Sequence, residues 1–211
     1  MADDHRLLRL GLRTMLSADP TMEIVGEAEN GHEAVDAAGK LSPDVILMDI
    51  SMPYLNGVLA TRQILANHPH IRIIALSMHS DEKYVAEMLT AGASAYLLKN
   101  SDTEELIHAI KLVYAGKKYL SPEITGHVVK DYMQGRPESP THGRSQLSQR
   151  QQEVLQLLTE GLASKEIASR LFISVKTVTT HRQDIMNKLN IHSIAELTKY
   201  AILQGLTSLE S

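Results

Sequence analysis

Apolar positions along the first half of the chain follow two alternating patterns. Short continuous runs of aliphatic and β-branched residues are typical of strands that are covered on both faces, and the segments between them carry apolar residues at helical spacing. In chain order, the patterns predict helix 5–18, strand 22–28, helix 31–41, strand 44–49, helix 57–67, strand 71–76, helix 81–91, strand 95–98 and helix 102–115. This alternation predicts an α/β fold with a doubly wound parallel sheet.

A different pattern follows a polar segment that is rich in proline and glycine. Residues 134–146 cannot bury a core, so we predict a linker there. Beyond it the sequence favours four short helices, each introduced by a serine N-cap, which is typical of a small all-α domain built on a helix-turn-helix. The expected caps are Ser148 with Gln151, Ser164 before Lys165–Leu171, Ser174 before Val175–Leu189, and Ser193 with Glu196.

Composition narrows the class of protein. The 211 residues include no cysteine, which excludes disulfides and a thiolate zinc site. No apolar run approaches the length of a membrane-spanning helix and no signal peptide is visible, so we expect a cytoplasmic protein without a membrane partner. The net charge of −4 divides unevenly. Residues 1–133 hold 12 basic and 18 acidic residues (−6), and residues 134–211 hold 9 and 7 (+2), which is weak evidence that the second part meets nucleic acid.

Candidate chemistry lies at the ends of the expected strands. Asp49 closes the run 44–49, Asp3-Asp4 precede the first helix, and Ser77 and Lys99 follow two later strands. Ligands of open α/β sheets bind at the carboxyl ends of the strands, where these side chains would converge. Grouped carboxylates suit Mg²⁺, an aspartate can attack phosphorus, and a lysine can neutralise the phosphoryl charge. Taken singly, Asp49 could be a turn former or a helix cap, and Lys99 a solvated surface charge.

One face of the expected helix Val175–Leu189 offers polar groups suited to DNA. Val178, Ile185 and Leu189 form its apolar side, which we expect to face the core. The opposite face could equally be an ordinary solvated surface. Read as a DNA contact, it presents groups that can reach base edges, with phosphate contacts at its margins. The candidates for bases are Lys176, Thr179, Thr180, Gln183 and Asn187, and those for phosphates are Ser164, Lys165, Arg182 and Lys188.

The first part of the chain resembles the receiver domain of two-component response regulators. The resemblance is carried by Ala2-Asp3-Asp4-His5, by Leu47–Pro53 with Asn56-Gly57, and by Ala95–Lys99. It implies Asp49 as phosphoacceptor, with Mg²⁺ held by Asp3, Asp4, Asp49 and the Ser51 carbonyl. It also implies that Lys99 contacts the phosphoryl group and that Ser77 and Tyr96 form a switch pair. For Tyr96 the alternative is a tyrosine lying at a sheet edge.

The second part resembles the LuxR-type DNA-binding domain. The motifs are Leu147-Ser148-x-Arg150, Glu153–Leu155, Lys165–Ala168, Ser174–Val178 and Thr180–Arg182. Together the two parts resemble a NarL/FixJ-type response regulator. That resemblance implies a receiver at 1–118, a connecting helix and linker at 119–146, and a DNA-binding domain at 147–211. It further implies phosphorylation by a sensor histidine kinase, binding to double-stranded DNA and a homodimer when active. The last helix, Ile194–Leu203, would carry dimer contacts or simply belong to the core.

One departure from the receiver pattern concerns its beginning. The receiver fold is flavodoxin-like, with strand order 2-1-3-4-5, and its internal first strand should precede Asp3-Asp4, where only Met1-Ala2 stand. We therefore expect that this strand has been lost through a misplaced start codon or a truncation, and that Asp3 and Asp4 are weakly anchored. An alternative function follows, a DNA-binding regulator that acts without phosphorylation. An aspartate-nucleophile phosphohydrolase is disfavoured, because Ser51 stands where such enzymes need an acid.

Overall fold

A computed structural model describes residues 1–78, 82–126 and 147–207. The chain divides into two compact units, Met1–Gly135 and Arg136–Ser211, which are described separately. The first unit is built on a parallel sheet and the second is helical within its described residues. Most of the predicted linker 134–146 and part of the expected connecting segment lie outside the described residues, although residues 122–126 are helical.

The sheet of the first unit is parallel throughout, as its apolar runs predict. Its strands are β1 (Val45–Asp49), β2 (Arg72–Ser77), β3 (Ala95–Leu98) and β4 (Tyr119–Leu120), in the spatial order β1-β2-β3-β4. The short edge strand β4 was not predicted, because a two-residue pair carries no readable periodicity. All residues of β3 are buried, and those of β1 and β2 are buried after the first position, since helices cover both faces.

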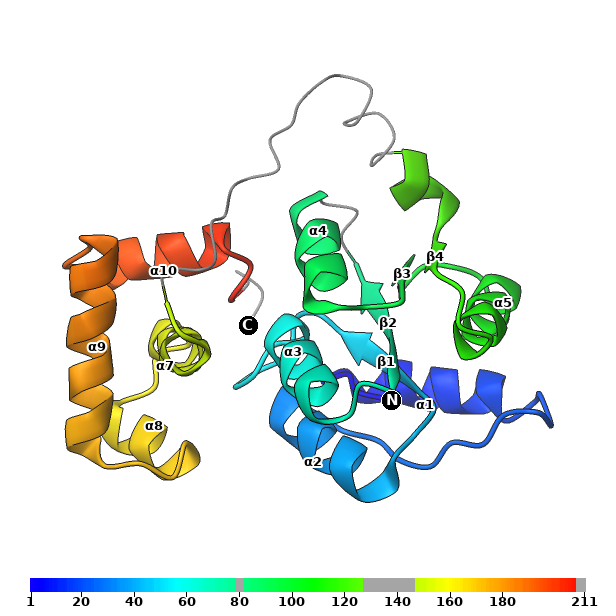
Figure 1. The fold of residues 1–211 in the computed structure, drawn as a ribbon, viewed down its shortest axis with the longest axis horizontal. Helices are drawn as coiled ribbons and strands as arrows, with labels where there is room; N and C mark the ends of the chain where they lie inside the picture. The colour runs from blue at the N-terminus through cyan, green and yellow to red at the C-terminus, as the bar shows by residue number, and fades with distance from the viewer. Residues whose placement is uncertain (79–81, 127–146, 208–211) are drawn as a thin grey trace. The chain divides into compact units, whose positions relative to one another are not determined.

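Helices cover the sheet in two layers, shown in Figure 1. On one face α1 and α5 share an apolar cluster with the strands, in which Leu12, Leu16, Leu106 and Val113 are buried. The other face carries α2, α3 and α4. The bounds are α1 (Arg6–Leu16), α2 (Gly31–Leu41), α3 (Gly57–Asn67), α4 (Glu82–Ala91) and α5 (Thr103–Tyr114).

The expected strand 22–28 is wrong as a hydrogen-bonded element. Of these residues only Ala28 pairs, through an isolated parallel bridge to Ala2, and Ala2 bridges Met48 on its other side. Residues 1–3 therefore lie between segment 22–28 and β1, in the position of an internal strand. Because this stretch offers a partner only to the end of segment 22–28, the rest of the segment forms no ladder.

The second unit has four helices in its described residues, as predicted, and three of the four expected caps are confirmed. They are α7 (Gln149–Thr159), α8 (Ser164–Arg170), α9 (Val175–Leu189) and α10 (Ile194–Leu203), and α7, α8 and α9 contact one another. Ser148 and Gln151 form a capping box. The prediction for Ser164 is wrong, because Ala163 is the N-cap of α8 and its backbone N–H donates to Glu166 at 2.7 Å.

Candidate functional site

Three charged side chains meet at the carboxyl ends of β1 and β3. The Lys99 ammonium lies 2.8 Å from Asp49 Oδ2 and 2.7 Å from Asp3 Oδ2. Asp3 and Asp49 are almost completely buried, and the Lys99 side chain is 6% exposed. Strand ends bring these residues together from positions 3, 49 and 99, as the sequence predicted, and the bland interpretations of Asp49 and Lys99 as isolated surface groups do not apply.

The loop after β1 holds Asp49 through backbone contacts. The Ser51 N–H donates to Asp49 Oδ1 at 3.3 Å, and the Gly57 N–H donates to the Ile50 carbonyl at 2.9 Å. A Cβ on Gly57 would lie 2.0 Å from the Asp49 carbonyl oxygen, so only glycine allows α3 to begin so close to the strand. Within this loop Tyr54 adopts a left-handed φ of 70°, an uncommon backbone conformation for a tyrosine that is often found beside functional sites.

The electrostatics of the site are unbalanced toward negative charge. Burial, and then the neighbouring charge of Asp3, raise the pKa of Asp49 to about 6, although Lys99 opposes the shift. Burial works to lower the pKa of Lys99, but Asp49 and Asp3 outweigh it, so this pKa lies above its ordinary value. Lys99 therefore stays charged at neutral pH, and a second cation would relieve the repulsion between the carboxylates.

Asp3 is firmly held, contrary to the expected weak anchoring. Its backbone N–H donates to the Ala28 carbonyl at 3.1 Å, and its carbonyl accepts a 2.7 Å hydrogen bond from Arg9. Arg9 is itself 5% exposed and forms ion pairs with Glu27 and Glu29. Backbone pairing of residues 1–3 on both sides thus replaces the support that a longer strand would give.

The site also fits a divalent cation. Asp3, Asp4, His5 and Asp49 each offer a ligand atom, and these atoms lie within 4.8 Å of one another. Buried carboxylate oxygens on Asp3 and Asp49 face the site, and hard oxygen donors suit Mg²⁺. The sequence interpretation missed His5, whose Nδ1 lies 2.8 Å from Asp4 Oδ1. Its position directly after two aspartates was the available signal.

Ser77 and Tyr96 occupy neighbouring strands at the same end of the sheet. Asp49 pairs with Leu76, so Ser77 lies one residue beyond the position opposite the carboxylate, and its carbonyl accepts the Lys99 N–H at 2.7 Å. Ser77 is 3% exposed and Tyr96 is fully buried. Because β4 covers the outer side of β3, Tyr96 does not lie on an edge strand, which disfavours the alternative interpretation of this residue.

The expected DNA face of α9 is exposed. Val178 and Ile185 are buried as predicted, Met186 joins them, and Leu189 is only half-buried. Two of the candidate hydroxyls, on Thr179 and Thr180, donate to the helix backbone and retain acceptor capacity. The exposed candidates are Lys165, Lys176, Thr179, Thr180, Gln183, Asn187 and Lys188, and Ser164 and Arg182 are half-buried.

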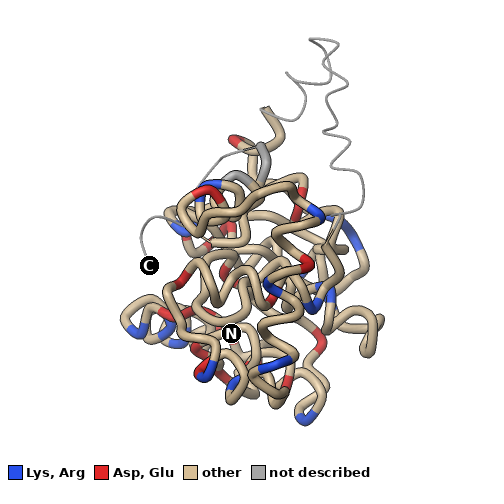
Figure 2. Tube along the Cα trace, turned by 90° about the vertical axis from the view of Figure 1, so that its left-hand side faces the viewer, with Lys and Arg blue, Asp and Glu red and all other residues tan. Residues whose placement is uncertain are grey.

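Lys188 has a partner inside the domain. Its ammonium donates to Gln151 Oε1 at 2.8 Å, and the same oxygen accepts the Ser148 N–H at 3.0 Å. Gln183 similarly donates to Asn187 at 3.1 Å. Figure 2 shows Lys and Arg positions interspersed with Asp and Glu positions along the trace rather than gathered in one block. Within the described ranges, no helix is both long and apolar enough to cross a membrane.

Two protein families match the two parts of the chain. Residues 1–111 match the response regulator receiver domain, and residues 145–201 match the bacterial regulatory proteins of the luxR family. The chain is 39% identical over 216 residues to the transcriptional regulatory protein DegU of Brevibacillus brevis, covering 96% of this chain and 92% of that protein. It is 40% identical over 210 residues to the oxygen regulatory protein NreC of Staphylococcus carnosus, covering 98% and 97%.

Solved structures of the regulator RcsB are also similar. RcsB from Salmonella enterica serovar Typhimurium, bound to the promoter rprA in the presence of the phosphomimetic BeF3-, is 26% identical with a TM-score of 0.58, covering 94% of this chain and 95% of that chain. A structure of two RcsB dimers bound to two parallel DNAs is 27% identical with a TM-score of 0.60, covering 98% and 97%.

Proposed function

The chain belongs to the response regulators of two-component systems that join a receiver domain to a LuxR-type DNA-binding domain, and we propose that Asp49 is its phosphoacceptor and that phosphorylation gates dimerisation and promoter binding. Its partners would be a sensor histidine kinase, a second copy of the chain and double-stranded DNA. A regulator of promoters works where the chromosome is, so we place it in the cytoplasm.

The juxtaposition of Asp49 with Lys99 supports this role most strongly. A nucleophilic carboxylate must approach a phosphoryl group that carries several negative charges, and a fixed cation beside it removes much of that repulsion. The Lys99 ammonium at 2.8 Å provides such a cation. Asp3, Asp4 and Asp49, with the Ser51 carbonyl, would hold Mg²⁺, which supplies further charge neutralisation when bound. No acid stands two residues after Asp49, and we assign no enzymatic turnover to the chain.

Ser77 and Tyr96 are the proposed reporters of phosphorylation. The Ser77 hydroxyl stands at the end of β2 and would hydrogen-bond a phosphoryl oxygen on Asp49. Movement of Ser77 would change the packing of Tyr96 on the neighbouring strand. Since the described Tyr96 is already buried, the change expected on phosphorylation is in its contacts rather than in its exposure.

The exposed face of α9 is the proposed reading surface. Lys176, Thr179, Thr180, Gln183 and Asn187 would meet base edges in the major groove. Ser164, Lys165, Arg182 and Lys188 would fix the register on phosphates. The promoter-bound RcsB structure supports this assignment by likeness of fold. Half-sites about one helical turn apart would suit the dimer.

Phosphate transfer tests the proposal directly. The full chain is incubated with ³²P-labelled acetyl phosphate and Mg²⁺, and we expect label on the wild type, none on Asp49→Asn, and full labelling of the matched control Asp44→Asn, an exposed carboxylate at the other end of the same strand. Promoter fragments selected from random DNA are then bound with and without the phosphodonor. Absence of label on the wild type, together with unchanged DNA affinity, would establish the phosphorylation-independent alternative instead.

A further inference from the structure

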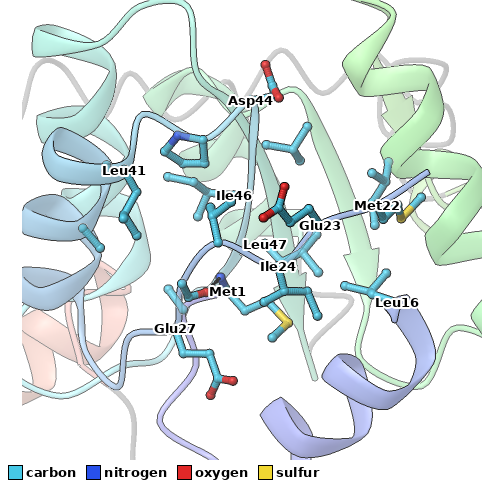
Figure 3. A pocket seen from close by; sticks show the side chains of 18 of the residues that line it. Met1, Leu16, Met22, Glu23, Ile24, Glu27, Leu41, Asp44, Ile46 and Leu47 are labelled. Atoms are coloured by element: carbon cyan, nitrogen blue, oxygen red, sulfur yellow. Dashed lines mark hydrogen bonds between the residues drawn. The ribbon is translucent and has the colours of Figure 1, made fainter. Parts of the chain in front are cut away.

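A groove of about 510 Å³ opens beside Met1 in the receiver unit. Residues 21–28 form one rim and residues 42–47 form the other. Figure 3 shows Leu41 and Leu16 on opposite sides of this space, with Ile24, Ile46 and Leu47 between them. Helix α2 contributes one apolar wall, and helices α1 and α5 contribute the other. The groove therefore has two backbone edges and two helical walls, which is the surrounding of an internal strand.

The first rim already has the side-chain pattern of a strand. Exposure alternates along residues 21–28, with even positions turned toward the core and odd positions toward solvent up to Glu27. Met22 and Ile24 pack against the same apolar cluster as α1 and α5. Among the described residues, however, the backbone of residues 23–25 finds no hydrogen-bond partner. This rim is an extended edge that lacks a neighbour.

Hydrogen bonds of Met1 and Ala2 fix which backbone groups face the groove. On the β1 side, Ala2 donates to the Leu47 carbonyl at 2.8 Å and accepts from Asp49 at 2.8 Å. On the other side, Met1 donates to the Gly26 carbonyl at 3.0 Å and accepts from Ala28 at 2.8 Å. Residues 1–3 are thus bonded on both sides as a parallel strand.

Strand geometry extends this register into the groove. The N–H and C=O of one strand residue point to one side, and those of its neighbours point to the other. The Leu47 N–H and both groups of Val45 therefore face the groove from one edge. The Gly26 N–H and both groups of Ile24 face it from the other. These donors and acceptors alternate in the spacing that one further strand would satisfy.

We propose that the groove is a strand-acceptor site that binds an extended apolar segment of about four residues, joined to the Met1 nitrogen and running parallel to β1. At about 3.3 Å per residue this length spans the two free edges, and apolar side chains are required because helices wall both faces. The proposal concerns the groove alone and does not rest on the role of Asp49.

A joined segment fits this groove better than a separate peptide. The Met1 nitrogen already donates in register to Gly26, and a peptide bond there would keep that hydrogen bond while removing a charge. Burial lowers the pKa of the Met1 amino group, so the charged ammonium is disfavoured in this position. A separate peptide would leave that ammonium in place and bring its own terminus against it. In the joined arrangement, the residue before Met1 bonds with Val45 and Leu47, and the one before that with Ile24 and Gly26.

The test compares three versions of the full chain by amide hydrogen exchange resolved by NMR. The first is unextended, the second carries Ile-Val-Ile-Val between the initiator methionine and Met1, and the third carries Ile-Val-Pro-Val, which lacks the N–H that should reach the Ile24 carbonyl. We expect the apolar extension to slow exchange at Ile24 and Gly26 by more than about tenfold. Exchange at Val25, whose N–H points away from the groove, should not change.

Thermal unfolding gives a second readout. The apolar extension should raise the Tm of the receiver transition by about 5 °C, and the proline version should raise it by less. Equal exchange at Ile24 and Gly26 in the extended and unextended chains would overturn the proposal, as would uniform slowing that includes Val25. A capped peptide, acetyl-Ile-Val-Ile-Val-amide, is added to the unextended chain as a further arm. Protection by this peptide but not by the extension would show that the occupant is not joined to Met1.

Discussion

Neutralising Asp49 is expected to stabilise the receiver in the absence of metal. The carboxyl pKa rises from its ordinary 3.8 to about 6 on folding, so the folded state holds this proton more tightly than the unfolded state. For such a group stability is highest below pH 4 and falls as the pH rises toward 6. Integrated to pH 7.5, the burial of the charged carboxylate costs about 3 kcal/mol, and at pH 4.5 only about 1 kcal/mol. Asp49→Asn removes that cost.

The measurement is urea unfolding with EDTA present at both pH values, followed by tyrosine fluorescence. Six of the seven tyrosines precede residue 134, so the signal reports mainly on the receiver. Asp49→Asn should be more stable than the wild type by about 2–3 kcal/mol at pH 7.5 and by about 1 kcal/mol at pH 4.5. The exposed Asp44→Asn control should stay within about 0.5 kcal/mol of the wild type. A variant no more stable than the wild type at pH 7.5, or an advantage independent of pH, would refute the electrostatic argument.

Three further outcomes are expected. Replacing Gly57 by alanine should cost about 2 kcal/mol or more in urea unfolding, because the new Cβ would lie 2.0 Å from the Asp49 carbonyl oxygen. Gly11→Ala in α1, where nothing lies within 4 Å, should instead be neutral or stabilising, and equal effects at the two positions would contradict the packing argument. Lys176→Ala should weaken binding to all DNA sequences alike and reduce the salt slope of the affinity by about 1, as measured by fluorescence anisotropy; a change of base preference would speak against a phosphate contact. Gln151→Leu should destabilise the helical unit by about 1–3 kcal/mol in thermal unfolding, since two donors lose one acceptor, and an unchanged Tm would show that water replaces it.

The sequence alone was a good guide to the sheet and to the residues at its carboxyl edge. Continuous apolar runs located β1, β2 and β3 within one or two residues, because burial on both faces leaves a clear signature. Strand polarity then brought Asp49 and Lys99 to the same edge without any knowledge of distances. The pattern could not show that segment 22–28 lacks a ladder, since side-chain alternation survives there although the hydrogen-bond partner is missing.

Anchoring and capping depended on backbone details that no residue pattern encodes. The firm hold on Asp3 comes from a carbonyl bonded by Arg9 and from pairing on both sides of residues 1–3. The N-cap of α8 moved from Ser164 to Ala163 because a glutamate side chain, rather than a serine hydroxyl, meets the first free N–H. His5 was overlooked because a single histidine lacks the spacing of a ligand pair, although the adjacent aspartates marked it.

The shared oxygen of Gln151 joins two parts of the DNA-binding unit that are 37 residues apart in sequence. It accepts the backbone of Ser148, the first residues after the linker, and the ammonium of Lys188 near the end of α9. The attachment point of the domain and its reading surface are therefore mechanically connected through one amide group. A phosphate that draws Lys188 toward DNA would slacken the entry to α7, and tension on that entry would in turn restrain Lys188.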